Sequence, residues 1–346
     1  MNNQHKITER RRLLDQNGYL SEPGYATSPV FDYRRGDIKA AGFRIKEWDY
    51  YYVGNSKHAV ALTIADNSYL ALVSVTVFDF IEKNQQTNTI MIPFTFGKLG
   101  LPESSRAGIT AFKNKTVDIS FVNDGIKRKL HCDFKNFTKG ENLLVDLTLS
   151  DEPHDTMVIA TPFAEDKRAF YYNQKINTMK ARGTVVHGGR TYIYDSADSM
   201  GTLDWGRGVW TYKNTWYWGS MSVVLPDGKP FGFNIGYGFG DTTAATENMI
   251  FYDGIAHKLS RVDFIIPVKN GNDDFMSPWR FTSDDGRFEL DFVPILDRYS
   301  KADLIILKSV QHQVFGKFSG RVILDDGKII ELKDQIGFAE KVFNKF

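Results

Sequence analysis

Acidic residues in aromatic and apolar surroundings are the part of this sequence whose residue types could do chemistry. Asp204 lies between Leu203 and Trp205, and Glu247 opens the apolar run of TENMIF. A carboxyl group removed from water has a raised pKa and can stay protonated near neutral pH. A neutral acid beside indole rings is suited to protonating an alkene, because an aromatic face attracts the cation that forms. Asp204 and Glu247 are therefore the candidate catalytic residues.

Each of these residues also has a structural interpretation. Asp204 could accept bonds from backbone amides or pair with Arg207, which would hold a loop in place. Arg207 could instead bind a substrate carboxylate. Glu247 could be partnered to a cation or a backbone nest, and Asn234 in GFNIGYGFG could bond a ligand or Glu247. The sequence leaves these alternatives open.

Residues 201–258 hold four of the six tryptophans. Trp216 and Trp218 must face the same side of a strand, because strand side chains alternate between two faces. Such rings form either a packed barrel core or the wall of a ligand cavity. His257 could pair with Asp253 or belong to a hairpin tip. The candidate ligand-binding residues in this segment are Trp205, Arg207, Trp210, Trp216, Trp218, Asn234, Asn248 and His257.

Other kinds of site are not supported by residue spacing. Gly232, Gly236, Gly238 and Gly240 do not match G-x-G-x-x-G, and no helix follows them, so we expect them to bend strands rather than bind phosphate. The histidines lack ligand spacing and Cys132 is the single cysteine, so we expect no metal site and no intrachain disulfide. No cofactor is expected.

Composition restricts the class of protein. The 346 residues are 42% hydrophobic and 14% aromatic, which suits two β-rich domains or one large double domain. A net charge of +1 gives no broad attraction to nucleic acid or anionic membranes. The N-terminus lacks the apolar region of a signal peptide, and no run reaches the roughly 18 apolar residues of a membrane span. We expect a cytoplasmic protein whose partner is a hydrophobic small molecule, with no nucleic acid partner and no stable membrane insertion; the oligomeric state is not indicated.

From Phe43 onward, short segments with strand patterns recur at intervals of about 8–12 residues, which is typical of an antiparallel barrel or sandwich. Residues 5–17 indicate a short polar helix or a mobile arm, and IGFAEKVF near the end indicates a short C-terminal helix. Tight turns between strands are expected at Asp66-Asn67, Asn123-Asp124-Gly125, Gly188-Gly189 and Asp325-Asp326-Gly327.

The segment ARGTVVHGGRTYIYDSADSMGTLDWGRGVW, followed by WYWGSMSVVLPDGK, resembles the core of the DUF2804 family, a domain of unknown function. The layout is more distantly similar to the tandem lipocalin-like (calycin) proteins, which include carotenoid hydratases of the hydroxyneurosporene synthase type and tocopherol cyclases. Asp204-Trp205-Gly206 stands at the place of their acidic-aromatic motif, without the histidine that those enzymes tend to carry there. The resemblance to DUF2804 is carried by Leu203 to Gly208, Trp216 to Gly219, Gly232 to Gly236, Thr246 to Asn248 and Asp253-Gly254.

These observations predict an all-β protein with two lipocalin-like antiparallel β-barrel domains packed in tandem and short terminal helices. The expected divisions are an N-terminal arm and lead-in at 1–40, a first barrel at 41–185 and a second barrel at 186–346. A barrel of this size holds one small apolar ligand.

Three functions fit this fold. The protein could be an enzyme that protonates a double bond of an isoprenoid-like substrate, as a hydratase, cyclase or isomerase. It could instead be a non-catalytic carrier of a lipophilic ligand, or a structural or stress protein without ligand. A closed interior filled by side chains at Asp204 and Trp216 would favour the last.

Overall fold

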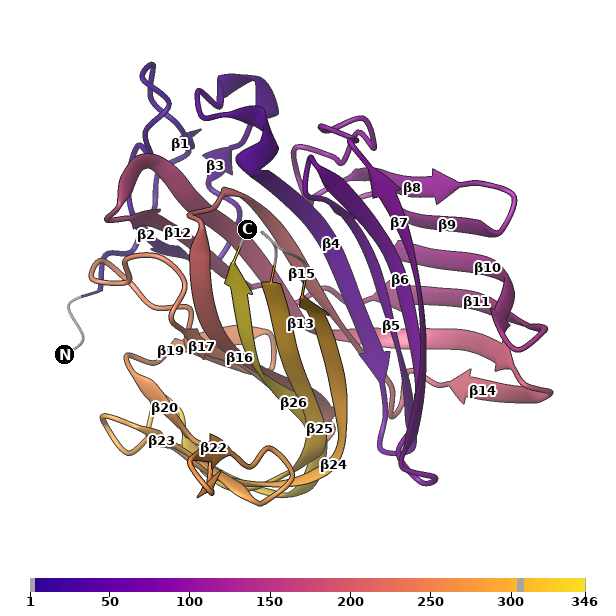
Figure 1. Cartoon of the computed structure of the whole chain (residues 1–346). Helices are drawn as coiled ribbons and strands as arrows, with labels where there is room; N and C mark the ends of the chain where they lie inside the picture. The colour runs from indigo at the N-terminus through magenta and orange to yellow at the C-terminus, as the bar shows by residue number, and fades with distance from the viewer. Residues whose placement is uncertain (1–3, 304–307, 346) are drawn as a thin grey trace.

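The computed structural model describes residues 4–303 and 308–345 and consists of strands and turns (Figure 1). Within these ranges the helical elements are two 3-10 turns, η1 (Arg35–Asp37) and η2 (Gly42–Arg44). The all-β class is therefore confirmed. None of the described helical elements is long and apolar enough to cross a membrane.

The first large sheet is built from residues up to Val209 and has thirteen strands among the described residues. Off its main path, β12 (Met157–Phe163) and β14 (Arg190–Tyr194) pair with β13, and β2 (Gly24–Ala26) pairs with β12. In spatial order the main path is β7 (Asn84–Pro93), β6 (Leu70–Asp79), β5 (His58–Asp66), β4 (Ile45–Gly54), β15 (Met200–Val209), β13 (Asp166–His187), β11 (Glu141–Ser150), β10 (Arg128–Thr138), β9 (Val117–Asn123) and β8 (Gly108–Lys113).

The second large sheet has nine strands in the described part of the chain. Two small two-stranded sheets complete the fold: β1 (Arg11–Arg12) with β3 (Phe31–Asp32), and β21 (Val268–Lys269) with β22 (Asn272–Asp273). In spatial order the second sheet is β19 (Ile255–Lys258), β18 (Met249–Tyr252), β17 (Pro230–Tyr237), β16 (Lys213–Val224), β26 (Ile329–Lys345), β25 (Lys308–Ile323), β24 (Phe288–Asp303), β23 (Trp279–Ser283) and β20 (Val262–Ile265).

Both large sheets are curled half-barrels with the same closing pattern (Figure 1). In each, the first long strand pairs with the last one: β4 with β15, and β16 with β26. Most strands that are neighbours in a sheet are also consecutive in the chain and antiparallel, so short turns can connect them. At the turn after β13, Gly188 and Gly189 both have positive φ, 59° and 71°, as expected for a two-residue hairpin.

The structure corrects the expected terminal helices. Residues 336–343, IGFAEKVF, belong to β26, which hydrogen-bonds to β16 on one side and β25 on the other. Because both faces of β26 are buried there, apolar residues occupy successive positions and imitate a helical pattern. Near the N-terminus, Ile7, Leu13 and Leu14 lie in an extended segment and are buried in the first core.

The hydrogen-bonded sheets divide between Val209 and Lys213. Residues 200–209, placed after the expected domain boundary at 185, form β15 and pair with β13 and β4 of the first sheet. The sheet to which β15 belongs is decided by its pairing with β4, which lies about 150 positions earlier in the chain, so local sequence could not indicate it.

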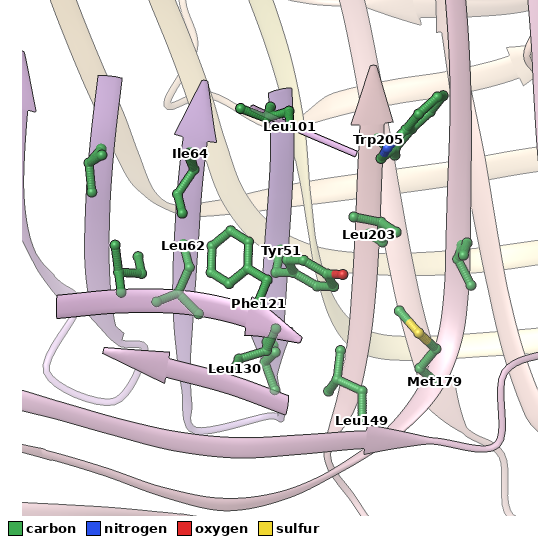
Figure 2. Close-up of a cluster of buried hydrophobic side chains, with 14 of the residues drawn as sticks. Tyr51, Leu62, Ile64, Leu101, Phe121, Leu130, Leu149, Met179, Leu203 and Trp205 are labelled. Carbon is green, nitrogen blue, oxygen red and sulfur yellow. The ribbon is translucent and has the colours of Figure 1, made fainter. Parts of the chain in front are cut away.

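The concave side of the first sheet is filled by packed apolar side chains, including the buried Trp205 (Figure 2). The concave side of the second sheet is filled in the same way by a separate, phenylalanine-rich cluster with Trp279. Both half-barrel interiors are therefore occupied by the protein's own residues. The first core includes Tyr51, Leu62, Ile64, Leu101, Phe121, Leu130, Leu149, Met179, Leu203 and Trp205.

The two sheets pack against each other through the opposite faces of their central strands. Tyr52 and Phe78 of the first sheet contact Phe315 and Phe338 of the second, with ring centroids 4.3–5.7 Å apart for Phe78–Phe315, Tyr52–Phe338 and Tyr52–Phe315. We call this region the inter-sheet layer. The strands β4, β13 and β15 are consequently buried on both faces.

Gly206 is required by this packing. A methyl group at this position would overlap the indole of Trp48, whose ring also packs on Tyr171 and Trp210. We expect Gly206→Ala to lower the free energy of unfolding by about 1–3 kcal/mol, measured by urea denaturation. The control Gly36→Ala, at an exposed site with open space around it, should change it by less than about 0.5 kcal/mol. Equal effects of the two substitutions would contradict this account.

Candidate active site between the sheets

Asp204 lies in the inter-sheet layer, because the residues on either side of it point into the first core. It is only 7% exposed. Its Oδ1 accepts a hydrogen bond from Nδ2 of Asn173 at 2.6 Å, and its Oδ2 lies 2.8 Å from Nζ of Lys175. Both partners are donors, which stabilise the ionised carboxylate. The partner of Asp204 is thus Lys175 and not Arg207.

Lys175 is a buried cation, 3% exposed, and the direct cross-strand neighbour of Asp204 in the β13–β15 pair. Its Nζ also lies 3.9 Å from the ring centroid of Trp218 on the second sheet. A positive charge over an indole face is electrostatically favourable. The face of Trp218 therefore already accommodates a cation in this site.

Trp218 connects Lys175 to Glu247. Its Nε1 donates to Oδ1 of Asn234 at 2.7 Å, and Nδ2 of Asn234 donates to the backbone oxygen of Glu247 at 2.9 Å and to its Oε2 at 3.4 Å. Gly236 allows the close approach of this carboxylate, since a Cβ there would lie 2.9 Å from Oε1 of Glu247. Asn234 thus bonds Glu247, one of the two partners that the sequence indicated.

The loop that carries Glu247 is held on both sides. The side chain of Gln4 accepts from the backbone nitrogen of Thr246 at 2.7 Å and donates to the oxygen of Leu259 at 3.0 Å. Lys258 donates to Oγ1 of Thr246 at 2.9 Å, and burial lowers the pKa of this lysine to about 7. Burial also raises the pKa of Glu247, with a smaller contribution in the same direction from Asp204.

Glu340 on β26 is a third carboxyl group in the layer and is 4% exposed. Its Oε1 accepts from Nε1 of Trp216 at 3.0 Å, and its Oε2 accepts from Nε2 of Gln313 at 3.0 Å and from Nε2 of Gln311 at 3.3 Å. All three donors are neutral. Burial raises the pKa of Glu340 to about 7, so that near neutral pH about half of the molecules carry a proton there.

An aromatic cluster adjoins Glu340 through Trp216. Trp210 contacts Trp216, Phe239 and Trp48 at centroid distances of 5.6, 4.9 and 5.5 Å. Tyr171 stacks on Trp48 at 6.2 Å. Trp48, Trp210 and Trp216 are each partly exposed, unlike the rings of the two half-barrel cores. The region beside Glu340 is therefore apolar and reaches the surface.

Three carboxyl groups, Asp204, Glu247 and Glu340, share the inter-sheet region with Lys175, which pairs with Asp204. Burial raises the pKa of Glu247 and that of Glu340, because the charged form loses its hydration. The phenol of Tyr171, on the same face of β13 as Lys175, also remains protonated because burial raises its pKa. The site can therefore hold a proton near neutral pH and donate it.

Four of the residues singled out in the sequence lie outside this cluster. Trp205 packs in the first core, edge-on to Tyr172 at 5.5 Å. Arg207 is fully buried on the same side and donates to Asp49 at 3.1 Å. The amide of Asn248 donates to the oxygen of Ser260 and accepts from the backbone of Gly236, and His257 lies 3.3 Å from Asp325 rather than against Asp253.

Trp210, Trp216, Trp218, Asn234, Asp204 and Glu247 do come together between the sheets. The residues that sequence reasoning missed are Lys175, Asn173, Tyr171, Gln313 and Glu340. Lys175 and Glu340 are charged residues within otherwise uncharged or largely apolar parts of strands, in FYYNQKIN and GFAEKVF, which is the signal that could have found them.

A family model confirms the resemblance seen in the sequence. The model described as domain of unknown function DUF2804 matches residues 4–346. The chain belongs to the DUF2804 family. No curated protein matches this DUF2804 chain significantly.

Two solved structures are similar to this DUF2804 protein to different degrees. An AttH-type protein from Nitrosomonas europaea has a TM-score of 0.53 and 12% identity, covering 91% of this chain and 98% of that one. Kievitone hydratase from Nectria haematococca has a TM-score of 0.44 and 11% identity, covering 87% and 88%. At this identity the AttH-type structure supports the fold alone. The lipocalin-like tandem architecture expected from the sequence is thereby confirmed.

Lys175 should be essential for stability because it is the buried counter-ion of Asp204. We expect Lys175→Met to lower the free energy of unfolding by about 3–5 kcal/mol, and Lys175→Met/Asp204→Leu to restore part of the loss, in urea denaturation. The exposed pair of Lys113 with Asp118 provides the control, and Lys113→Met should leave stability nearly unchanged. A double variant no more stable than Lys175→Met would contradict the pairing.

Glu340 should make the protein less stable as pH rises. Its pKa is about 7 in the folded state against 4.5 ordinarily, so between these values the folded protein retains a proton that the unfolded chain releases. At 1.36 kcal/mol per pKa unit, the loss amounts to about 3 kcal/mol. Glu340→Gln should therefore gain stability relative to wild type between pH 5 and pH 8, whereas Glu331→Gln, at an exposed position of β26, should not. Parallel pH profiles for wild type and Glu340→Gln would be incompatible with this assignment.

Proposed function

We propose that this protein is an enzyme that protonates a double bond of a hydrophobic, isoprenoid-like small molecule bound between the two sheets. The observation that carries the proposal is Glu340, a buried carboxyl group with a raised pKa beside a partly exposed aromatic cluster. A general acid works best when its pKa lies near the working pH. An apolar substrate fits the aromatic side of the site better than a polar one.

In the proposed reaction Glu340 is the acid. Its O–H bond breaks, a C–H bond forms at one alkene carbon, and the adjacent carbon becomes a cation. The partly exposed indole ring of Trp216 stabilises this charge, because an aromatic face attracts a cation. Water bonding to the cation and losing a proton would complete a hydration; loss of a neighbouring proton would complete an isomerisation.

The two acids singled out in the sequence keep roles in this proposal. Asp204 holds Lys175 in place through their ion pair. Glu247 is the proposed proton acceptor, because it shares the layer and is oriented by Asn234. A carrier without turnover would use the same residues only as pocket walls.

The proposal is tested by deuterium transfer. Incubating the protein in D2O with a lipid extract of its source cells should place non-exchangeable deuterium in one product, detected by mass spectrometry. Glu340→Gln should lower the rate by about 10²–10⁴-fold, because the amide cannot donate the proton in the same way. Glu331→Gln, a matched change on the exposed part of β26, should act like wild type. A ligand that binds wild type and is recovered unaltered would support the carrier function instead.

A further inference from the structure

Arg298 extends the row of residues that contains the proposed acid. In the paired strands β24, β25, β26 and β16, Arg298 lies opposite Gln313, Gln313 opposite Glu340, and Glu340 opposite Trp218. Residues directly opposite each other on adjacent strands share a face of the sheet. Arg298 is therefore at the outer end of one line of side chains that runs across the inter-sheet face to Trp218.

The guanidinium of Arg298 has spare hydrogen-bonding capacity. It has five N–H donors, and its Nη1 donates to Oε1 of Gln313 at 3.1 Å. Among the side chains that the structure describes, no carboxylate lies within ion-pair distance of it. The residue is partly exposed as a whole, but its guanidinium is buried, and burial lowers the pKa of this group, while the nearby Tyr50 and Glu340 raise it. A buried cation is costly unless a counter-ion is bound to it. The planar fork of donors matches the two oxygens of a carboxylate.

Tyr50 gives a second, independent sign of a missing acceptor. It lies on the facing sheet, 7% exposed, with its ring 5.9 Å from that of Trp218. Its buried hydroxyl has no hydrogen-bond partner in the described part of the chain. The nearby amide of Gln313 is already engaged at both ends, by Arg298 and by Glu340. A buried donor without an acceptor is costly unless a ligand supplies one.

We propose that the molecule bound between the sheets carries a carboxylate, which Arg298 and Tyr50 hold at one end of the site. This inference rests on the proposed function and names its substrate class: an isoprenoid-like carboxylic acid. The Cα atoms of Arg298 and Glu340 are two strands apart, roughly 10 Å. The double bond that Glu340 protonates is therefore separated from the carboxylate by several bonds.

A substrate carboxylate bound at Arg298 would also favour proton donation by Glu340. A negative charge near the row disfavours ionisation of Glu340 and so keeps the acid protonated while the substrate is bound. Because the carboxylate is remote from the double bond, it cannot activate that bond by conjugation. Direct protonation by an acid is then the available route.

The test compares citronellate with citronellol, an isoprenoid acid and its alcohol with the same remote double bond, by calorimetric titration at pH 6.5, where the carboxyl group of the probe is ionised and Glu340 is mostly protonated. Wild type should bind citronellate at least about tenfold more tightly than citronellol. Arg298→Gln should abolish this preference and leave the affinity for citronellol unchanged, while Arg298→Lys should keep part of it. Tyr50→Phe, which retains the ring, should weaken citronellate binding alone, by about threefold or more.

Arg280→Gln is the charge-matched control, since Arg280 is exposed and already paired with Glu289 and Asp291; it should bind both probes as wild type does. Equal affinities in wild type, or a preference that survives in Arg298→Gln, would overturn the inference. If citronellol binds as well as citronellate and Glu340→Gln still loses deuterium transfer, the proposed function stands without the carboxylate. If wild type binds neither probe and shows no deuterium transfer, both proposals fall.

Discussion

Burial of β13 on both faces is the constraint on which the rest of the molecule depends. One face carries Phe170 and Tyr172 into the first core, and the other carries Asn173 and Lys175 against the second sheet. A strand in this position cannot send a charged side chain to water. Lys175 therefore needs a counter-ion inside the fold, and Asp204 supplies it from the neighbouring strand.

The same constraint places the candidate site outside the half-barrels. Their concave sides are occupied by two separate clusters of apolar side chains, so the polar residues collect where the convex faces meet. Glycines permit this meeting: Gly206 makes room for Trp48, and Gly236 for Glu247. The partly exposed Trp216 shows that this layer reaches the surface beside Glu340.

Different partners give the carboxyl groups of the layer different roles. Asp204 has an ammonium group at 2.8 Å, whereas Glu340 has only the neutral donors of Trp216, Gln311 and Gln313. Neutral donors offset the loss of hydration only in part, so the proton stays on Glu340 at higher pH. Glu340 is therefore the carboxyl group of the layer whose pKa lies near neutral pH.

The sequence by itself determined the all-β class, the hairpin turns and the family, and it indicated six residues of the candidate site. Local alternation and turn chemistry carry that information, and Trp216 and Trp218 share a face simply because they are two residues apart. Only the tertiary structure decided that Asp204 pairs with Lys175, that Trp205 and Arg207 turn into the first core, and that Glu340 joins the site. These contacts link residues far apart in the chain, so they depend on strand register and sheet packing. The strand β26 lacks the usual alternation of apolar and polar residues, because both of its faces are buried.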